Sequence, residues 1–274
     1  MTYTSPSPSS SILAVIPARY GSTRFPAKPL ALLKGKPMIE HTWRRVTSHP
    51  LVSRCVVATD HPDIFDCIIA LGGEAMMTSP HHASGSDRIW EVASQYPEYP
   101  WVLNVQGDEP YFPQENLDLL LHSVAHQTSN AHHKVFPYDV LTLATPFPEQ
   151  HPNSPLIQDP HKVKAVLSVD SKEDYDQEKY YNALYFSRAV VPHVRDTLAP
   201  LSSPQWFWHM GVYLYQRAAL EAFTTLPVHP LETLEGLEQL RLLANGYRIG
   251  VGITPHQAFG VDTPEDLAYL NKQH

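Results

Sequence analysis

A short stretch near the start of the chain gathers three cations around a glycine and a serine. Arg19, Arg24 and Lys28 fall within ten residues, and Gly21 and Ser22 lie between the first two. Arginine and lysine bind phosphate oxygens, and small residues let backbone N–H groups approach an anion closely. The stretch therefore indicates a polyphosphate site, although a loop of solvated surface cations has the same composition. It is not a Walker A loop, because Gly-Lys-Ser/Thr is missing.

Two aspartates are candidates for binding a metal ion. Asp108 follows the apolar run 101–105 directly after Gly107, and Asp262 stands in a glycine-containing segment near the end of the chain. Mg²⁺ prefers oxygen ligands and uses one or two carboxylates together with phosphate oxygens and water. Asp also caps helices and turns, and the local sequence of Asp262 favours that structural role.

The elements that must position these residues alternate between strand and helix in the first half of the chain. Short apolar runs predict buried strands at 12–16, 54–59 and 101–105 and a further strand at 75–77, with helices between them. Open α/β sheets bind ligands at the carboxyl ends of their strands, which is where the cation-rich stretch and Asp108 fall. We therefore predict an α/β fold with a doubly wound, mainly parallel, Rossmann-like sheet.

The second half is less regular, and its strands favour antiparallel pairing. Residues 231–245 are predicted to form one helix that ends before Gly246, with Leu234, Leu237 and Leu240 facing inward. Thr263 is predicted to cap a last helix that begins at Pro264. Predicted strands are 140–145, 164–169, 182–187, 209–215 and 247–253.

We predict a single domain over residues 12–274 and a disordered tail over residues 1–11. Within the domain, residues 182–230 are predicted to form a smaller antiparallel lobe for dimerisation and substrate binding.

Composition narrows the possible partners. The formal net charge of −8 argues against nucleic acid, and no apolar run is long enough to span a bilayer. The first residues lack the basic and apolar regions of a signal peptide, and Cys55 and Cys67 have no CxxC spacing, so we predict a cytoplasmic protein. His122 and His126 are spaced as a zinc pair on a helix, but without a third ligand a solvated face is favoured.

Several segments together resemble the sugar-activating nucleotidyltransferases, and most closely the 3-deoxy-manno-octulosonate (Kdo) cytidylyltransferases. They recur in order from Ile12 to about Leu270, so the resemblance covers nearly the whole chain. The segments are Pro-Ala-Arg-Tyr-Gly-Ser-Thr-Arg-Phe-Pro-Ala-Lys-Pro-Leu at 17–30, Ala-Thr-Asp-His at 58–61, Ser-Gly at 84–85, Asn-Val-Gln-Gly-Asp-Glu-Pro at 104–110, Tyr-Phe-Ser-Arg at 185–188, His-Met-Gly-Val-Tyr at 209–213, Leu-Glu-Gln-Leu-Arg at 237–241 and Gly-Val-Asp-Thr-Pro-Glu-Asp-Leu at 260–267.

The resemblance implies a Mg²⁺-dependent homodimer that transfers CMP from CTP to the anomeric hydroxyl of Kdo, for lipopolysaccharide-type sugar activation. It implies Lys28, Arg19 and Asp108 as catalytic residues. Arg88 suits the carboxylate of Kdo, which a guanidinium can grip with two hydrogen bonds. The implied contacts are Arg19, Ser22, Lys28 and Gln106 to CTP, Asp108 and Asp262 to Mg²⁺, and Arg88, His209, Tyr213, Glu238 and Gln239 to the sugar acid.

Structural roles remain open for three of these residues. Arg88 could be a cation on a helix face, His209 a core histidine and Tyr213 an inward-facing aromatic residue. Two positions depart from the family pattern: Ala27 stands where the family often has glycine, and Trp208 stands where a cation is common. The change at Trp208 leaves the fine choice of sugar open.

Two other functions are compatible with the sequence. One is activation of a related substrate, such as a sialic acid, an amino analogue of Kdo or a polyol phosphate. The other is a non-catalytic nucleotide- or sugar-binding protein on the same fold, since fold does not imply function. The presence of Lys28 together with both aspartates argues against this second alternative.

Overall fold

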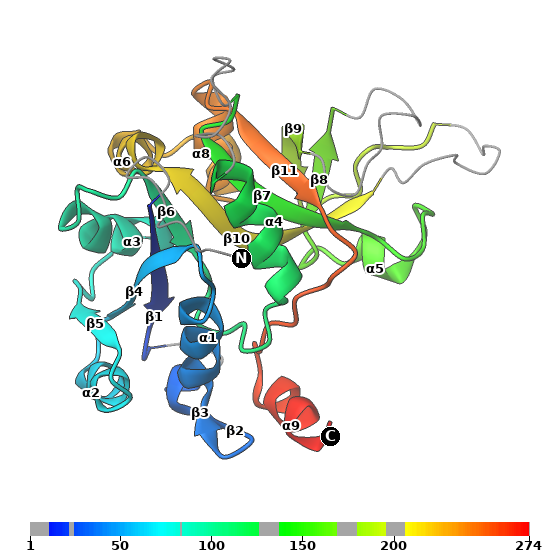
Figure 1. Cartoon of the computed structure of the whole chain (residues 1–274). Helices are drawn as coiled ribbons and strands as arrows, with labels where there is room; N and C mark the ends of the chain where they lie inside the picture. The colour runs from blue at the N-terminus through cyan, green and yellow to red at the C-terminus, as the bar shows by residue number, and fades with distance from the viewer. Residues whose placement is uncertain are drawn as a thin grey trace, which may run out of the picture. The chain divides into compact units, whose positions relative to one another are not determined.

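The structure, a computed structural model, describes residues 11–21, 25–82, 84–125, 137–168, 180–195 and 206–273 (Figure 1). Residues 1–10 of the predicted tail, Ser22, Arg24 and His126 lie outside the described residues. Contacts group the chain into two compact units. Unit 1 comprises residues 1–131, 214–224 and 258–274, and unit 2 comprises residues 132–213 and 225–257.

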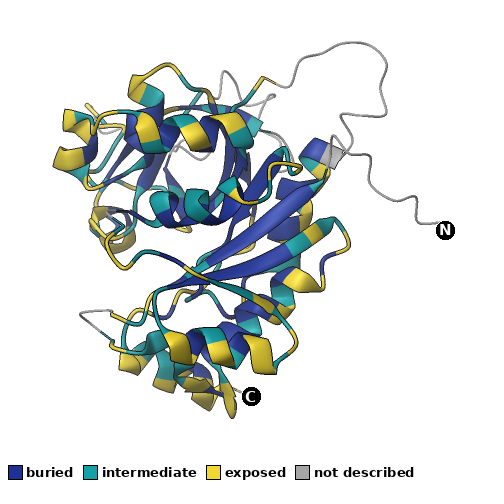
Figure 2. Ribbon diagram, turned by 90° about the vertical axis from the view of Figure 1, so that its left-hand side faces the viewer, coloured by how far each residue is buried: buried dark blue, intermediate teal, exposed yellow. Residues whose placement is uncertain are grey.

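Unit 1 contains four neighbouring parallel strands, which are the four predicted ones. β1 (Ile12–Ala18) lies between β4 (Val52–Thr59) and β6 (Trp101–Asn104), and β5 (Glu74–Met77) pairs with the far side of β4 (Figure 1). All three pairings are parallel. Residues 12–16 of β1 are fully buried, as a strand covered on both faces requires (Figure 2).

Helices pack on these strands, as the alternating sequence pattern predicts. α1 contacts β4 and β1, α2 contacts β5 and β4, and α3 contacts β1 and β4. The helices of unit 1 are α1 (Met38–Thr47), α2 (Pro62–Ala70), α3 (Gly85–Ser94), α4 (Gln114–Ala125), α6 (Arg217–Thr225, whose last residue groups with unit 2) and α9 (Pro264–Lys272), together with the short 3-10 helix η2 (Lys28–Leu30).

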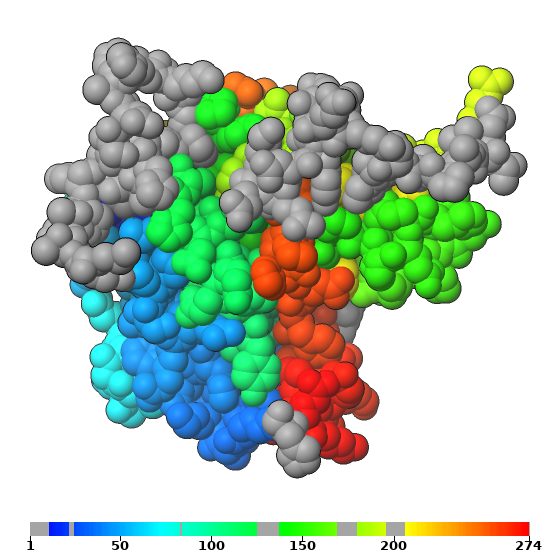
Figure 3. Space-filling model, turned by 45° about the vertical axis from the view of Figure 1, so that its right-hand side comes forward, coloured from blue at the N-terminus to red at the C-terminus, as the bar shows by residue number. Residues whose placement is uncertain are grey.

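The C-terminal segment packs on the N-terminal third of unit 1. Val261 and Leu270 share a buried cluster with Leu33 and Met38. Asn271 binds the backbone of the hairpin formed by β2 (Leu32–Leu33) and β3 (Lys36–Pro37). Figure 3 shows the C-terminal segment in red against the blue surface of the N-terminal residues. This packing brings Asp262 to the edge of the sheet that carries Asp108.

The predicted N-terminus of the last helix is confirmed. The side chain of Thr263 accepts a hydrogen bond from the Asp266 N–H, and the Asp266 carboxylate accepts one from the Thr263 N–H. This reciprocal capping box satisfies two backbone donors at the start of α9, and Pro264 takes the first helical position.

Unit 2 has a mixed sheet. β11 (Ile249–Ile253) runs parallel to β7 (Val140–Pro146) and antiparallel to β9 (Tyr180–Ser187). β8 (Lys164–Leu167) pairs antiparallel with β9 and with the first residues of β10 (Phe207–Gln216). Residues 214–216 of β10 and most of α6 group with unit 1. The assignment of residues 12–274 to a single domain and of residues 182–230 to a dimerisation and substrate-binding lobe stays a prediction.

The prediction of one helix over 231–245 was wrong. Two short helices, α7 (Pro230–Glu235) and α8 (Gln239–Ala244), are separated by Gly236 in the left-handed conformation, with φ 61°. Glycine adopts this conformation without the steric cost of a Cβ, and it ends α7 there. The break shifts the helical register, so Leu234 is 81% exposed, whereas Leu237 and Leu240 are buried.

Candidate active site

The Lys28 ammonium lies between the two predicted metal ligands. Its Nζ is 2.6 Å from Asp108 Oδ2 and 3.5 Å from Asp262 Oδ1, and it donates to the Val261 carbonyl at 2.8 Å. The Val261 N–H in turn donates to the Asp108 carbonyl at 2.9 Å. Three segments far apart in the sequence therefore converge at the carboxyl ends of the parallel strands, where such sheets bind ligands.

Glu109 adds a third carboxyl group beside this pair. Its Oε2 is buried and has no hydrogen-bond partner among the residues that the structure describes. Burial, together with the nearby charges of Asp108 and Asp262, raises the pKa of Glu109 to about 8. This pKa keeps Glu109 largely protonated at neutral pH, so the negative charge of the site comes from Asp108 and Asp262, with which the Lys28 ammonium pairs.

The donor chemistry of the site fits Mg²⁺. Asp108 and Asp262 offer two carboxylates that approach the same point, and Asp262 is mostly solvent-exposed. Over the described ranges, no group of three or more His, Cys, Asp or Glu residues could hold a metal ion. A site with two carboxylates still suits Mg²⁺, since phosphate oxygens and water complete its coordination in nucleotide enzymes.

Gly107 is required where β6 ends close to β1. A Cβ built on Gly107 would lie 2.8 Å from the Pro17 carbonyl oxygen and 3.2 Å from Ile39 Cδ1. A backbone atom cannot move aside as a flexible side chain can, so Gly107 lets Asp108 approach the end of β1. Gln106, predicted to contact cytidine, is partly exposed at the same strand end, with its Nε2 3.5 Å from Asn104 Oδ1.

A backbone hydrogen bond joins the described residues on either side of positions 22–24 in the cation-rich stretch. The Ala27 N–H donates to the Tyr20 carbonyl at 2.9 Å, which brings these two residues together. Arg19 is exposed directly after β1, and its positive charge contributes to lowering the pKa of Arg88. Lys28 follows Ala27 directly and begins η2.

Ala27 has a backbone conformation that explains why related sequences often have glycine there. Its φ is 54°, in the left-handed region, where a Cβ approaches the following carbonyl oxygen. Ala27→Gly is expected to stabilise the protein by about 0.5–1 kcal/mol, because relief of this strain exceeds the extra flexibility of the unfolded chain. Urea unfolding would measure the change. The control is Ala31→Gly, at a residue with ordinary extended geometry, which is expected to destabilise.

Arg88 is buried, with a side chain only 1% exposed. Its Nη2 lies 3.0 Å from Asp60 Oδ2, and its Nη1 donates to the Thr78 hydroxyl. Burial lowers the pKa of Arg88, and Asp60 opposes that shift by stabilising the charged form. Asp60 was not among the predicted site residues, although it belongs to the segment Ala-Thr-Asp-His at 58–61.

His209 and Tyr213 lie together in unit 2 on β10. Their ring centroids are 5.5 Å apart, and His209 also contacts Phe186 edge to face. His209 Nε2 is 3.0 Å from the Thr142 hydroxyl, whose own hydrogen is directed to a backbone carbonyl, Val212 O at 2.7 Å. Nε2 is therefore assigned as the protonated nitrogen that donates to Thr142.

Burial lowers the pKa of His209 to about 3, so the ring is neutral at ordinary pH. Because an unfolded histidine binds a proton near pH 6.5, its stabilising contribution is complete above that pH and is lost as the pH falls toward 3. Between about pH 7 and about pH 5, the free energy of unfolding is expected to fall by about 2 kcal/mol more in the unsubstituted protein than in His209→Asn. Urea unfolding at both pH values measures this, and His161→Asn, at an exposed histidine, should leave the difference unchanged.

Glu238 and Gln239 lie at the start of α8. Gln239 is buried, and its Nε2 has no partner in the described part of the chain. The preceding turn is held by Arg188, which sequence reasoning did not single out: its Nε donates to the Glu235 carbonyl at 2.6 Å, and its backbone N–H to the Glu235 carboxylate at 2.8 Å. The segment Tyr-Phe-Ser-Arg at 185–188 was the available signal.

Trp208, at the position where the family commonly has a cation, packs against an apolar cluster. Its ring stacks on Phe147, with centroids 6.2 Å apart, and contacts a cluster that includes Ile157 and Trp206. Lys162 Nζ lies 3.7 Å from the centre of the Trp208 ring. A positive charge is therefore present at this position in space, although it comes from a different segment.

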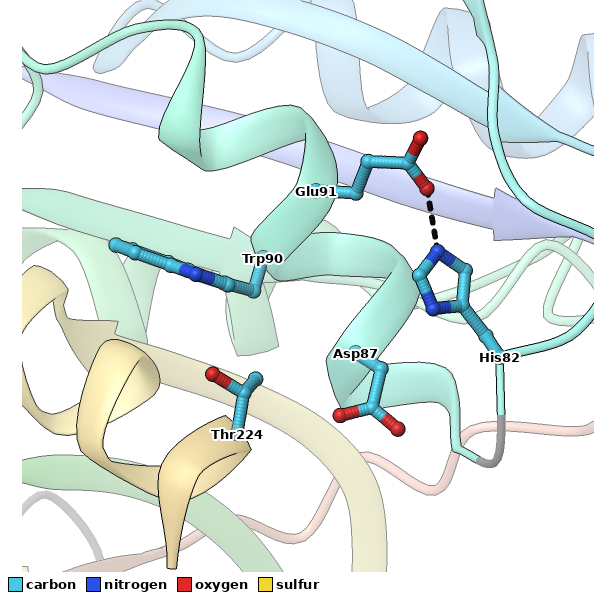
Figure 4. A pocket seen from close by; sticks show the side chains of 5 residues that line it. All are labelled: His82, Asp87, Trp90, Glu91 and Thr224. Atoms are coloured by element: carbon cyan, nitrogen blue, oxygen red, sulfur yellow. Dashed lines mark hydrogen bonds and ion pairs between the residues drawn. The ribbon is translucent and has the colours of Figure 1, made fainter.

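Unit 1 also has a pocket beside α3. Figure 4 shows the side chains that line it, with an ion pair between His82 and Glu91. Asp87 is occupied in capping α3 through Ser84. None of the predicted site residues lines this pocket, so it adds nothing to the arrangement around Lys28. Its lining residues are His82, Asp87, Trp90, Glu91 and Thr224.

An α/β fold with a cationic loop and two carboxylates at the strand ends is the arrangement expected of a nucleotidyltransferase. The chain belongs to the cytidylyltransferase family, whose model matches residues 13–249. Among the helices of the described residues, none is long and apolar enough to cross a membrane.

Within that family, the chain is similar to proteins named 3-deoxy-manno-octulosonate cytidylyltransferase. The one from Syntrophus aciditrophicus is 41% identical over 259 residues, which are 94% of each chain. The one from Thermodesulfovibrio yellowstonii is 39% identical over 95% of this chain and 96% of the relative. A solved structure of CMP:2-keto-3-deoxy-manno-octonic acid synthetase complexed with CTP has a TM-score of 0.81 and 34% identity, covering 96% of this chain and 97% of that one.

Proposed function

We propose that this protein transfers CMP from CTP to Kdo and releases pyrophosphate. The main structural support is that Lys28, Asp108 and Asp262 converge on one point at the carboxyl ends of the parallel strands. The relatives named above support the choice of sugar, and the CTP in the similar solved structure supports the choice of nucleotide.

In the proposed reaction, the anomeric hydroxyl of Kdo attacks the α-phosphorus of CTP in line. A new bond forms between the sugar oxygen and phosphorus, the bond to the bridging oxygen breaks, pyrophosphate leaves, and the hydroxyl proton is released to solvent. Positioning and charge stabilisation dominate such transfers. Lys28 and Arg19 neutralise charge on the phosphates, Ser22 binds a phosphate oxygen, and Gln106 contacts the cytidine. Arg88, His209, Tyr213, Glu238 and Gln239 remain predicted contacts of the sugar acid.

The chain binds Mg²⁺ through Asp108 and Asp262 in this proposal. When bound, the ion supplies positive charge to the phosphates of the nucleotide. Lys28 Nζ lies 2.6 Å from Asp108 and 3.5 Å from Asp262, so its ammonium would share these two carboxylates with the ion. The same ammonium is within reach of the phosphate-binding loop, because Lys28 follows Ala27 at the end of that loop.

We further propose a doubly wound, Rossmann-like nucleotide-diphospho-sugar transferase fold and a homodimer, by similarity to the family. A cytoplasmic location is proposed because CTP is a cytoplasmic substrate. Size-exclusion chromatography with light scattering would test the dimer, and a monomer at working concentration would contradict it.

The proposed function is tested by measuring pyrophosphate release from CTP, Mg²⁺ and Kdo, beside ATP, GTP and UTP. Release only with CTP and Kdo is expected. Parallel reactions with a sialic acid, an amino analogue of Kdo and a polyol phosphate distinguish the related activities. CTP binding by calorimetry without turnover on any of these substrates would overturn the proposal and favour a binding protein.

A further inference from the structure

Tyr20, at the neck of the cationic loop, is fixed at three points. Its N–H donates to Asp60 Oδ1 at 3.1 Å, and its carbonyl accepts the Ala27 N–H at 2.9 Å. Its ring stacks on His61, with centroids 3.7 Å apart and an interplanar angle of 13°. Arg19 precedes Tyr20 and Lys28 follows Ala27, so this neck sets the starting direction of both cationic side chains.

The hydrogen bonds that fix Tyr20 belong to a network that extends to α3. Asp60 uses one carboxylate oxygen for the Tyr20 N–H and the other for Arg88, at 3.0 Å. Arg88 also donates to the Thr78 hydroxyl, which donates to the Thr59 carbonyl at 3.0 Å. One polar network therefore joins α3 to the carboxyl ends of β5, β4 and β1.

The burial of Arg88 makes its pairing with Asp60 energetically important. An arginine with a 1% exposed side chain is costly unless it is paired, and Asp60 is the carboxylate that pairs with it. Only Asp60 Oδ2 accepts from Arg88, because Asp60 Oδ1 accepts from the backbone N–H of Tyr20. A charged acceptor holds an N–H more strongly than a neutral one, so the pair strengthens the hold on the loop.

We propose that Asp60 and Arg88 are positioning residues for the nucleotide, with Arg88 orienting Asp60 and Asp60 fixing the neck of the phosphate-binding loop at Tyr20. The inference rests on the proposed function, because it assigns the loop to the phosphates of CTP. It gives Arg88 an indirect role, in place of the predicted direct contact with the carboxylate of the sugar acid.

The test compares nucleotide binding with sugar use in Asp60→Asn and Arg88→Met. Calorimetry with CTP and calorimetry with inorganic pyrophosphate are each expected to show binding weakened by about tenfold or more, the usual effect of losing a hydrogen bond to a charged group. The KM for Kdo should stay within about twofold of the unsubstituted value. The double variant should bind CTP no more weakly than the weaker single variant, because both substitutions break one chain of contacts.

Further variants separate positioning from a general loss of folding. His61→Leu removes the stacked ring without touching the buried charges, and is expected to weaken CTP binding by about twofold to tenfold. Asp66→Asn, at an exposed carboxylate on α2, is the matched control and should bind CTP normally. Normal CTP binding by Asp60→Asn and His61→Leu would overturn the proposal.

A direct sugar contact predicts the opposite pattern. If Arg88→Met raised the KM for Kdo and left CTP binding unchanged, Arg88 would contact the sugar and the positioning role would be wrong. Binding of CTP and pyrophosphate needs no turnover, so these measurements still decide the positioning role if the unsubstituted protein fails to use Kdo. If Asp60→Asn showed normal turnover and normal CTP binding, the positioning role would be wrong and the proposed function would still stand.

Discussion

Asp108→Asn is expected to lower turnover by about 10² or more, comparable with removing one preorganised electrostatic group from an active site. Asp108 is the nearest carboxylate to Lys28 and one of two proposed Mg²⁺ ligands, at 2.6 Å and 3.5 Å from the same ammonium. Asparagine keeps the shape of the side chain but removes the charge. The measurements are kcat from pyrophosphate release and Mn²⁺ binding followed by electron paramagnetic resonance, which reports the metal site without turnover.

Stability should change much less than activity in this variant. The Lys28–Asp108 pair is partly exposed, and such pairs contribute at most about 1 kcal/mol. Asp66→Asn removes an exposed carboxylate from the same unit and should leave both turnover and Mn²⁺ binding unchanged. Near-normal turnover in Asp108→Asn would show that the metal assignment is wrong, whereas lost turnover with unchanged Mn²⁺ binding would limit Asp108 to orienting Lys28.

Arg241→Met is expected to destabilise unit 2 by about 3–5 kcal/mol, because it leaves a buried carboxylate without its partner. Arg241 Nε lies 2.7 Å from Glu232 Oε2, and its Nη2 lies 2.5 Å from Oε1, so the pair is bidentate. Both side chains are 10% exposed. The pair joins α7 to α8, and urea unfolding with hydrogen exchange of the two helices would measure the loss.

Two variants decide whether the unpaired charge causes that loss. The double variant Glu232→Leu/Arg241→Met removes both charges and should be considerably more stable than Arg241→Met alone, since apolar replacement of a whole buried pair is often close to neutral. Arg248→Met removes an exposed arginine from the same unit and is expected to cost less than about 1 kcal/mol. Equal losses in the single and double variants would point to lost packing of the arginine stem instead.

Local sequence patterns determined much of unit 1. Apolar runs predicted the four parallel strands. The reason holds for β1, β4 and β6, since a strand buried on both faces has no polar face to show, whereas β5 is partly exposed. Thr263 and Pro264 predicted the start of α9, since capping depends on residues within one turn of each other. Local pattern failed at 231–245, where apolar spacing suggested one helix and the left-handed Gly236 divides it into two.

Residue types and family resemblance, both read from the sequence, nominated Lys28, Asp108 and Asp262, but only the tertiary structure brought them to one point. Asp262 reaches Lys28 because Val261 and Leu270 bury their side chains against Leu33 and Met38, a long-range packing event that no local pattern encodes. The burial of Arg88 and its pairing with Asp60 were likewise decided in three dimensions. Spacing along the chain fixes which side chains share an element, whereas their charge environment depends on which elements pack together.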